Sequence, residues 1–181
     1  MVREIVIWPD PVLRQKCQEV EQVDDELRRL IDDMFETMYA AKGVGLAAPQ
    51  VGVTRRVVVI DTSPSQEGAK PLALINPRIT RTEGERVYEE GCLSVPGEAE
   101  EVVRADKVWF TALDRDGKEY SMEADGLLAI AVQHELDHLD GTLFVDRLST
   151  LKRELIKRRM KRLKAEREAE KNKKKAEQSA V

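Results

Sequence analysis

The sequence has few of the features that mark a secreted or membrane-bound protein. Its 181 residues include two cysteines, Cys17 and Cys92, which can form at most one disulfide bond. The N-terminal residues have no long apolar run and contain an acid at Glu4, unlike a secretory signal. No stretch reaches the roughly 20 apolar residues that a membrane-spanning helix requires. We therefore expect a cytoplasmic protein with reduced thiols and no membrane association.

The chain also has no internal repeat and no sign of a second folded domain. Hydrophobic residues make up 41% and charged residues 35% of the sequence, which is typical of a soluble globular domain. The net charge of −4 is unevenly distributed. Residues 152–181 contain 13 basic and 5 acidic side chains, whereas residues 1–151 carry a net charge of −12. We expect one domain over residues 1–150 and a basic helical extension over residues 151–181, frayed at its end.

An N-terminal helix is predicted over residues 24–42. Its apolar residues recur at three- and four-residue spacing, Asp24 can cap its first turn, and Gly43 can end it. Met34 and Met38 belong to this apolar series, so we interpret them as core residues rather than ligands.

Runs of apolar and β-branched residues predict several strands, with turn residues between them. The second strand is expected to stop at Asn76-Pro77, and residues 114–117 are typical of a hairpin turn. The expected strands cover residues 57–60, 72–75, 85–88, 102–103, 107–113 and 119–123.

A second helix is predicted to begin with Asp125 as its cap and to close at Asp140-Gly141. Residues 127–132 are apolar on every side of this helix. Such a helix is buried in a core rather than lying on a surface. A functional group that this helix carries would therefore be held rigidly.

The chain's two histidines lie four residues apart on this helix. Residues at positions i and i+4 project from one face, so His134 and His138 can bind one metal ion together. Glu135 falls at the edge of that face, where it can act on a water bound to the same metal. The alternative is two ordinary histidines that pad a helix, but random placement would rarely produce this spacing.

Catalytic metal sites of this kind commonly have three protein ligands, so a third is needed. It can be a distant Asp or Glu, as in metalloproteases, or Cys92. Gly91 and Pro96 favour Cys92, because they allow an unusual backbone path around it. A thiolate with two imidazoles suits zinc or ferrous iron. A buried structural thiol is the alternative for Cys92, and we interpret Cys17 as a partly exposed thiol without a role.

Three separated segments resemble the three motifs of the peptide deformylase family, in the family's order. They are residues 43–50 (GVGLAAPQ), 90–94 (EGCLS) and 133–139 (QHELDHL), and the resemblance spans about residues 1–160. It implies an α+β fold in which antiparallel sheets pack around a central buried helix carrying the metal motif, with an N-terminal and a C-terminal helix. It also implies removal of the N-formyl group from the formylmethionine of nascent polypeptides, with release of formate.

The resemblance further implies a role for each motif residue. It makes Cys92, His134 and His138 the metal ligands and Glu135 the general acid/base. It makes the Gln50 side-chain amide and the Leu93 backbone N–H the donors to the developing oxyanion. For Gln50 the alternative is an amide that satisfies local backbone. The implied metal is Fe²⁺ in the cell, with Zn²⁺, Ni²⁺ or Co²⁺ as possible substitutes.

Apolar residues seven, four and three positions before His134 continue the ligand face of the helix. They suggest a pocket for a methionine side chain, with plain core packing as the alternative: Leu127, Ile130 and Ala131. Val44 and Gly45 are expected to offer backbone to an extended peptide, as in strand addition. We include Glu90 in the substrate site; it can orient the Cys92 loop, with a surface acid as the alternative.

Two features of the sequence bear on the binding partners, one on the peptide substrate and one on RNA. After Pro96 the chain has Gly97-Glu98-Ala99, where some relatives place a basic residue toward the substrate. The basic extension either only aids solubility or, as the resemblance implies, docks on ribosomal RNA near the exit tunnel.

We expect a monomer. A metalloendopeptidase is the first rival function, but the chain has no third histidine; a silent RNA-binding relative is the second.

Overall fold

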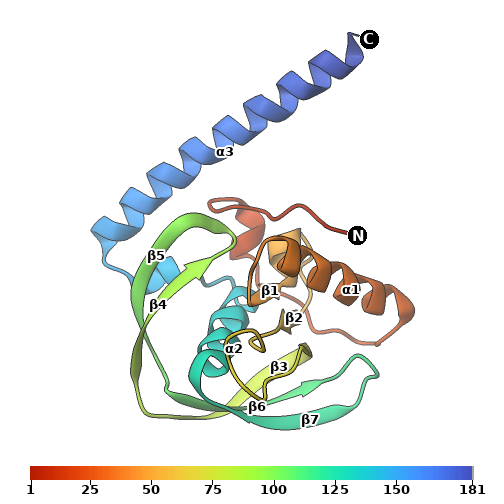
Figure 1. Ribbon diagram of the computed structural model, residues 1–181, viewed down its shortest axis with the longest axis vertical. Coiled ribbons are helices and arrows are strands. Elements are labelled where there is room, and N and C mark those ends of the chain that lie inside the picture. Colours follow the sequence, from red (N-terminus) through yellow and green to blue (C-terminus); the bar gives the residue numbers. More distant parts are fainter. Residues whose placement is uncertain (181) are drawn as a thin grey trace.

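The computed structural model describes residues 1–180 (Figure 1). Its α-helices (α), 3₁₀ helices (η) and strands (β) follow one another as η1 (Pro11–Arg14), α1 (Asp25–Ala40), β1 (Gly45–Ala47), η2 (Ala48–Val51), β2 (Val57–Ile60), β3 (Leu72–Glu83), β4 (Arg86–Cys92), β5 (Val95–Arg104), β6 (Lys107–Leu113), β7 (Glu119–Ala124), α2 (Gly126–Leu139), η3 (Phe144–Arg147) and α3 (Thr150–Ser179).

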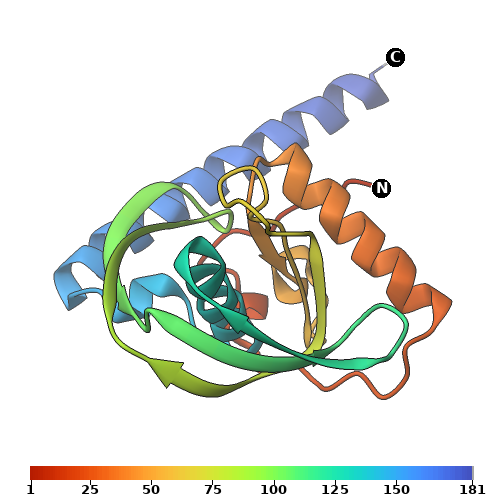
Figure 2. The same ribbon diagram turned by 60° about the horizontal axis from the view of Figure 1, so that its bottom comes forward.

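The strands form two antiparallel sheets. Five strands are ordered β1-β2-β3-β6-β7, and β4 and β5 form a separate two-stranded ribbon. Helix α2 contacts β1, β2 and β6 and lies in the middle of the molecule (Figure 2). The expected α+β fold, with antiparallel sheets around a central buried helix, is confirmed.

Strand β2 packs between helices α1 and α2 and helps to bury α2 in the core. All four of its residues are completely buried, because each face of the strand packs against a helix. Val57 and Val59 belong to the apolar cluster that includes α1, whereas Val58 and Ile60 belong to the cluster that includes α2. Alternate side chains of a strand point to opposite faces, so one β-branched run can serve both helices. The metal motif therefore sits on a helix fixed by the core.

Helix α1 starts as predicted but ends earlier. Asp24 accepts a hydrogen bond from the Leu27 N–H at 2.8 Å, and both methionines of the helix are completely buried. The residue with left-handed backbone after the helix is Lys42 (φ 56°), not Gly43. Gly43 is needed for another reason: a Cβ there would lie 2.7 Å from the Leu93 side chain. This close approach brings the Cys92 turn against the loop after α1.

Strand β3 does not stop at Asn76-Pro77 as predicted. It continues to Glu83 with a shift in pairing after Ile75, a bulge that accommodates a proline without an N–H. The Asn76 side chain holds the Val20 N–H and carbonyl at 2.8 and 2.9 Å. These contacts, made far away in the sequence, outweigh the turn preference of the Asn-Pro pair.

The start of α2 also differs from the prediction. Asp125 occupies the cap position, but its side chain accepts no hydrogen bond from the first turn of the helix. Gln66 takes that role, because its Oε1 accepts from the Leu128 N–H at 3.1 Å while its Nε2 donates to Asp125. A residue from the loop before β3 thus caps the helix that carries the metal motif.

The interpretation of Cys17 as partly exposed is wrong. Its side chain is 4% exposed and packs in the core cluster that includes α2, and its N–H donates to the Leu139 carbonyl at 2.8 Å. Burial raises the pKa of the Cys17 thiol to about 11. Both cysteines are free thiols.

Helix α3 extends from the body along the outside of the molecule (Figure 1). Ser149 caps its start by accepting from the Lys152 N–H at 3.3 Å. Ile156 and Met160 are buried in the cluster beneath it, and no residue between Met160 and Ala180 is buried. Beyond Met160 the helix is held by ion pairs of Lys164 with Asp10 and of Lys171 with Glu4. Among residues 1–180, no helix combines the length and the apolar character that crossing a membrane would need.

Candidate metal centre and active site

Three predicted metal ligands meet at one point. The ligand atoms of Cys92, His134 and His138 all lie within 4.8 Å of one another. The Cys92 Sγ is 3.3 Å from the His138 Nε2, and the centres of the two imidazole rings are 5.1 Å apart. Burial lowers the pKa of His138 well below its usual value, which favours the neutral form that binds metals. A thiolate with two imidazoles is a donor set for a divalent transition metal.

Glu135 lies beside these ligands and is 5% exposed. Burial raises the pKa of its carboxyl to about 7. Its Oε2 has no hydrogen-bond partner among the described residues, so one carboxyl oxygen is left to interact with a bound group. A Cβ at Gly45 would lie 2.7 Å from the Glu135 Oε1, so only glycine at this position leaves room for the carboxyl.

Glu90 fixes the orientation of His134. Its Oε1 lies 2.7 Å from the His134 Nδ1, and Arg104 donates from Nε and Nη2 at 2.7 and 2.8 Å. Burial alone would raise the pKa of Glu90, but hydrogen bonds from Arg104 and His134 outweigh it and lower the pKa to about 2. Glu90 is 3% exposed, so the surface-acid alternative is wrong. With Nδ1 held, His134 presents Nε2 to a metal.

Gln50, in η2, contacts the centre through its side-chain amide. Its Oε1 accepts from the Ala47 N–H at 2.9 Å, which agrees in part with the alternative of a local backbone contact. Its Nε2 is directed elsewhere, at 3.1 Å from the Ser94 Oγ and 3.5 Å from the Cys92 Sγ. Leu93 lies in the turn between β4 and β5, where pairing shifts after Gly91. Both proposed oxyanion donors therefore belong to the surroundings of Cys92.

The centre opens into a cleft of about 620 Å³. Its lining contains Cys92, His134 and Glu135 together with the predicted pocket and backbone residues Val44, Gly45, Glu90, Leu127, Ile130 and Ala131. Gln50 and His138 are not in that lining; both lie behind Cys92, whose sulfur they contact. The structure thus brings all twelve sequence-predicted site residues to one place.

These geometric features are those of a metallohydrolase, and comparison with known proteins is more specific. The family model described as polypeptide deformylase matches residues 2–154. The chain belongs to the polypeptide deformylase family. It is 56% identical over 163 residues to a peptide deformylase of Alkalilimnicola ehrlichii, covering 90% of each chain.

Comparison with solved structures supports the same family. The crystal structure of a peptide deformylase from Legionella pneumophila is similar with a TM-score of 0.86 and 48% identity, covering 92% of this chain and 98% of that one. A peptide deformylase from Ehrlichia chaffeensis in complex with actinonin has a TM-score of 0.86 and 43% identity over 89% of this chain and 96% of that one. The chain is a metal-dependent hydrolase with peptide deformylase activity, which removes the N-formyl group from nascent peptides.

The structure also adds residues to the deformylase site that sequence reasoning missed. Arg104 holds Glu90, and Tyr88 lines the cleft. Glu98 lines it as well, and it belongs to the segment after Pro96 that the sequence had already indicated. A motif could not reveal Arg104, because the pairing of β4 with β5 sets Glu90 opposite Glu100 and Arg104 opposite Arg86, and only the folded ribbon brings the Arg104 side chain to Glu90. Alternation along the two strands indicates which side chains share a face, but it does not identify their partners.

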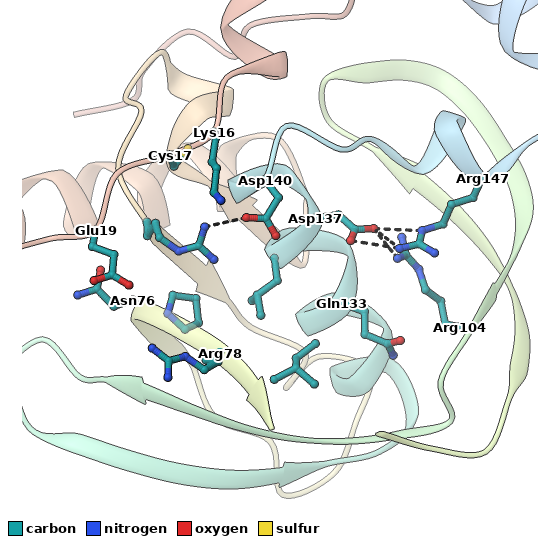
Figure 3. Close-up of a pocket in the computed structure, with 14 residues that line it drawn as sticks. Lys16, Cys17, Glu19, Asn76, Arg78, Arg104, Gln133, Asp137, Asp140 and Arg147 are labelled. Atoms are coloured by element: carbon teal, nitrogen blue, oxygen red, sulfur yellow. Dashed lines mark hydrogen bonds and ion pairs between the residues drawn. The ribbon is translucent and has the colours of Figure 1, made fainter. Parts of the chain in front are cut away.

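Behind α2 lies a second cleft, of about 500 Å³, that contains none of the metal ligands (Figure 3). Asp137 points into it and accepts from the Arg104 Nη1 at 2.6 Å and the Arg147 Nη2 at 3.0 Å. The Gln133 amide bonds both the N–H and the carbonyl of Ala105, each at 2.9 Å. These contacts attach the deformylase metal helix to its surroundings from the rear.

Proposed function

We propose that Cys92, His134 and His138 hold the catalytic metal of this deformylase and that Glu135 is its general acid/base. The observation that carries the proposal is the convergence of the three donors within 4.8 Å, next to a buried carboxyl with an unpartnered oxygen. A metal held there would supply Lewis acidity, which makes water a stronger nucleophile near neutral pH.

Glu135 accepts and then donates the proton in the proposed reaction. A carboxyl whose pKa is about 7 can accept a proton at neutral pH and also give it back. Glu135 takes the proton from the water as it attacks the formyl carbon, and it passes the proton to the amine as the amide bond breaks. The products are formate and a peptide with a free N-terminus.

Gln50 and Leu93 stabilise the charge that develops on the formyl oxygen. The anchored Oε1 of Gln50 fixes the direction of its Nε2 donor, which lies beside Cys92 and Ser94. The Leu93 backbone N–H is the second donor. Loss of one such donor typically lowers turnover by about a hundred- to a thousandfold.

The peptide lies along the cleft in an extended form. Leu127, Ile130 and Ala131 form an apolar wall for the methionine side chain, and the backbone at Val44 and Gly45 pairs with the peptide. Glu90 was expected in the substrate site, but His134 and Arg104 occupy both of its oxygens. We therefore assign Glu90 the positioning of His134.

The assignment is tested with metal-loaded protein, formyl-Met-Ala-Ser and the same peptide without the formyl group. Formate should be released from the first peptide, and neither should be cut internally. Internal cleavage would indicate an endopeptidase, and no reaction with either peptide would indicate a silent relative. Actinonin, found in complex with the deformylase of Ehrlichia chaffeensis, should inhibit the reaction.

We infer that the metal in the cell is Fe²⁺, with Zn²⁺, Ni²⁺ or Co²⁺ as substitutes. The partly exposed Cys92 supports an oxygen-sensitive centre, because a thiolate beside ferrous iron is open to oxidation. The iron form should be the more active and should lose activity in air. Equal turnover of the pure iron and zinc forms, without loss in air, would contradict this inference.

We infer that residues 1–150 form the catalytic domain and that residues 151–181 form a basic extension that docks on ribosomal RNA. Exposed cations of α3 without an ion pair among the described residues support docking, because phosphate binding needs uncommitted positive charge. We also infer that the protein is cytoplasmic and that it is a monomer. Sedimentation of the metal-loaded protein would test the oligomeric state.

The docking test should leave the core intact. Removing α3 would expose Ile156 and Met160, so neutralisation is preferable. In one variant five exposed α3 cations become glutamine, a good helix former: Arg158, Lys161, Lys173, Lys174 and Lys175. A matched variant changes five exposed cations of the body: Lys16, Arg29, Lys70, Arg78 and Lys118. Only the first should lose salt-sensitive co-sedimentation with ribosomes; equal behaviour of both would refute docking through α3.

A further inference from the structure

Glu98 lies in the wall of the cleft that holds the metal ligands. It follows Gly97 near the start of β5 and lines the cleft together with Cys92 and His134. Its side chain is 14% exposed, so most of it is packed while part of the surface remains open. The mechanism proposed above does not use this carboxylate.

A residue of the C-terminal helix holds Glu98. The Arg159 Nη2 donates to the Glu98 Oε2 at 2.8 Å, and the Arg159 Nε donates to the other oxygen. This bidentate ion pair connects α3 to the wall of the cleft. A neighbouring ion pair joins Lys152 of α3 to Glu100 of β5 at 2.9 Å, but Glu100 lies outside the cleft lining.

The cleft has an acidic excess. Lys42 is the one basic side chain among the described residues that line it, against four acids: Glu89, Glu90, Glu98 and Glu135. Arg104 already neutralises Glu90 inside the protein, and Glu135 is buried beside the metal ligands. Glu89 and Glu98 are therefore the carboxylates that a bound peptide can meet, and Glu98 is the one with a basic partner in α3.

We propose that Glu98 determines how the enzyme responds to the charge of the residues that follow formylmethionine, and that Arg159 limits this response. The proposal rests on the function proposed above, because it takes the peptide to lie along this cleft. A lysine or arginine of the substrate is attracted to Glu98, and a glutamate is repelled. Arg159 shares the same carboxylate, so its removal exposes the substrate to the full charge.

The expected effect is modest because the site is partly open to water. Ion pairs at such positions usually change a rate or an equilibrium by about two- to fivefold, and salt weakens them. The C-terminal helix would then have two uses in this chain: it carries the basic surface, and through Arg159 it adjusts substrate preference.

The test uses metal-loaded, full-length protein and measures kcat/KM for formyl-Met-Lys-Ser and formyl-Met-Ala-Lys and for their glutamate counterparts. The wild type should prefer lysine over glutamate. Arg159→Gln should raise the lysine-to-glutamate ratio by about two- to fivefold, and Glu98→Gln should lower it by a similar factor. In the double variant, the effect of Arg159→Gln should disappear, since its target carboxylate is gone. High salt should reduce every ratio toward one.

Glu100→Gln is the matched control, because it breaks the same kind of β5–α3 ion pair away from the cleft and should leave the ratio at the wild-type value. Formyl-Met-Ala-Ser serves as the neutral reference. No turnover of this peptide by the wild type would contradict the proposed function itself. Normal turnover with the same charge ratio in all variants would overturn the role of Glu98 alone. If Glu98→Gln does not fold, Arg159→Gln still decides: an unchanged or lower ratio refutes the proposal.

Discussion

Toward the metal cleft, helix α2 presents a buried carboxyl oxygen that lacks a hydrogen-bond partner, whereas toward the rear cleft its polar side chains are hydrogen-bonded. On the first face, Glu135 Oε2 has no partner among the described residues. On the second face, the Gln133 amide makes three hydrogen bonds and Asp137 accepts from two arginines (Figure 3).

The two faces of α2 therefore have different roles: residues on the metal face serve the reaction, and residues on the rear face stabilise the fold. A carboxyl oxygen without a protein partner is available for chemistry, whereas a side chain whose polar atoms are all hydrogen-bonded within the protein stabilises the fold. The rear face makes the contacts that hold the helix in place. Substitutions on the metal face should therefore affect activity more than stability, and substitutions on the rear face should do the reverse.

The largest effect is expected from Glu135→Gln on the metal face. This change keeps the shape of the side chain but removes the proposed base, so kcat/KM should fall by about a hundred- to ten-thousandfold. Thermal unfolding should occur at the same or a higher temperature, because a buried carboxyl is replaced by a neutral amide. The measurements are formate release and a melting curve. Undiminished turnover would remove Glu135 from the mechanism, and a large fall in melting temperature would break the contrast between the two faces.

Glu90→Gln should affect both faces, because Glu90 joins His134 on one side to Arg104 on the other. Metal affinity should fall by about 10- to 100-fold when the orienting carboxylate is lost. Stability should fall by about 3–5 kcal/mol, since the buried guanidinium loses the carboxylate to which it donates from two nitrogens. Chelator competition and denaturant unfolding measure the two effects. Glu101→Gln, an exposed change on β5, is the control and should move neither quantity.

Asp137→Asn tests the rear face alone. The two arginines lose a charged acceptor, so stability should fall by about 1.5–3 kcal/mol, while kcat/KM should change by less than about threefold. Asp140→Asn is a matched control on the same side of α2, because Asp140 is 55% exposed and pairs with Arg56. It should reduce stability by less than about 1 kcal/mol. A loss of activity in Asp137→Asn without a loss of stability would contradict the assignment of this face.

The sequence was informative on the metal face for a geometric reason. The spacing of His134 and His138 is a local property of one helix, so their shared direction could be predicted before any tertiary contact was known. The rear face has no such signal. Asp137 belongs to the same motif, but its partner Arg104 arrives through strand pairing 33 residues away in the sequence.

Elsewhere, tertiary contacts overrode local preferences. The Asn76-Pro77 pair is typical of a strand end, yet the hydrogen bonds between Asn76 and Val20 carry the chain through a bulge. Asp125 has a capping side chain, yet Gln66 from a distant loop makes the cap. Element types were therefore predictable from patterns, while bounds and the supporting contacts of the site depended on the fold.

The two cysteines provide the smallest and most direct test of the comparison. Cys92 is partly exposed at the metal cleft, whereas Cys17 is buried in the floor of the rear cleft. Burial raises the pKa of Cys17 from its ordinary value of 9 to about 11. At pH 8 its thiolate fraction is then roughly a hundredfold lower than that of an unperturbed thiol, and only thiolates react with iodoacetamide.

Chelator-treated native protein should therefore be alkylated at Cys92 but not at Cys17, and peptide mass spectrometry distinguishes the two sites. The folded state favours the neutral thiol of Cys17. The stability from that preference is present below about pH 9 and is lost as the pH rises through 11. Alkylation of Cys17 should accordingly begin only with denaturant or strongly alkaline pH. Rapid labelling of native Cys17 at pH 8 would show that the rear of α2 opens as readily as the metal face.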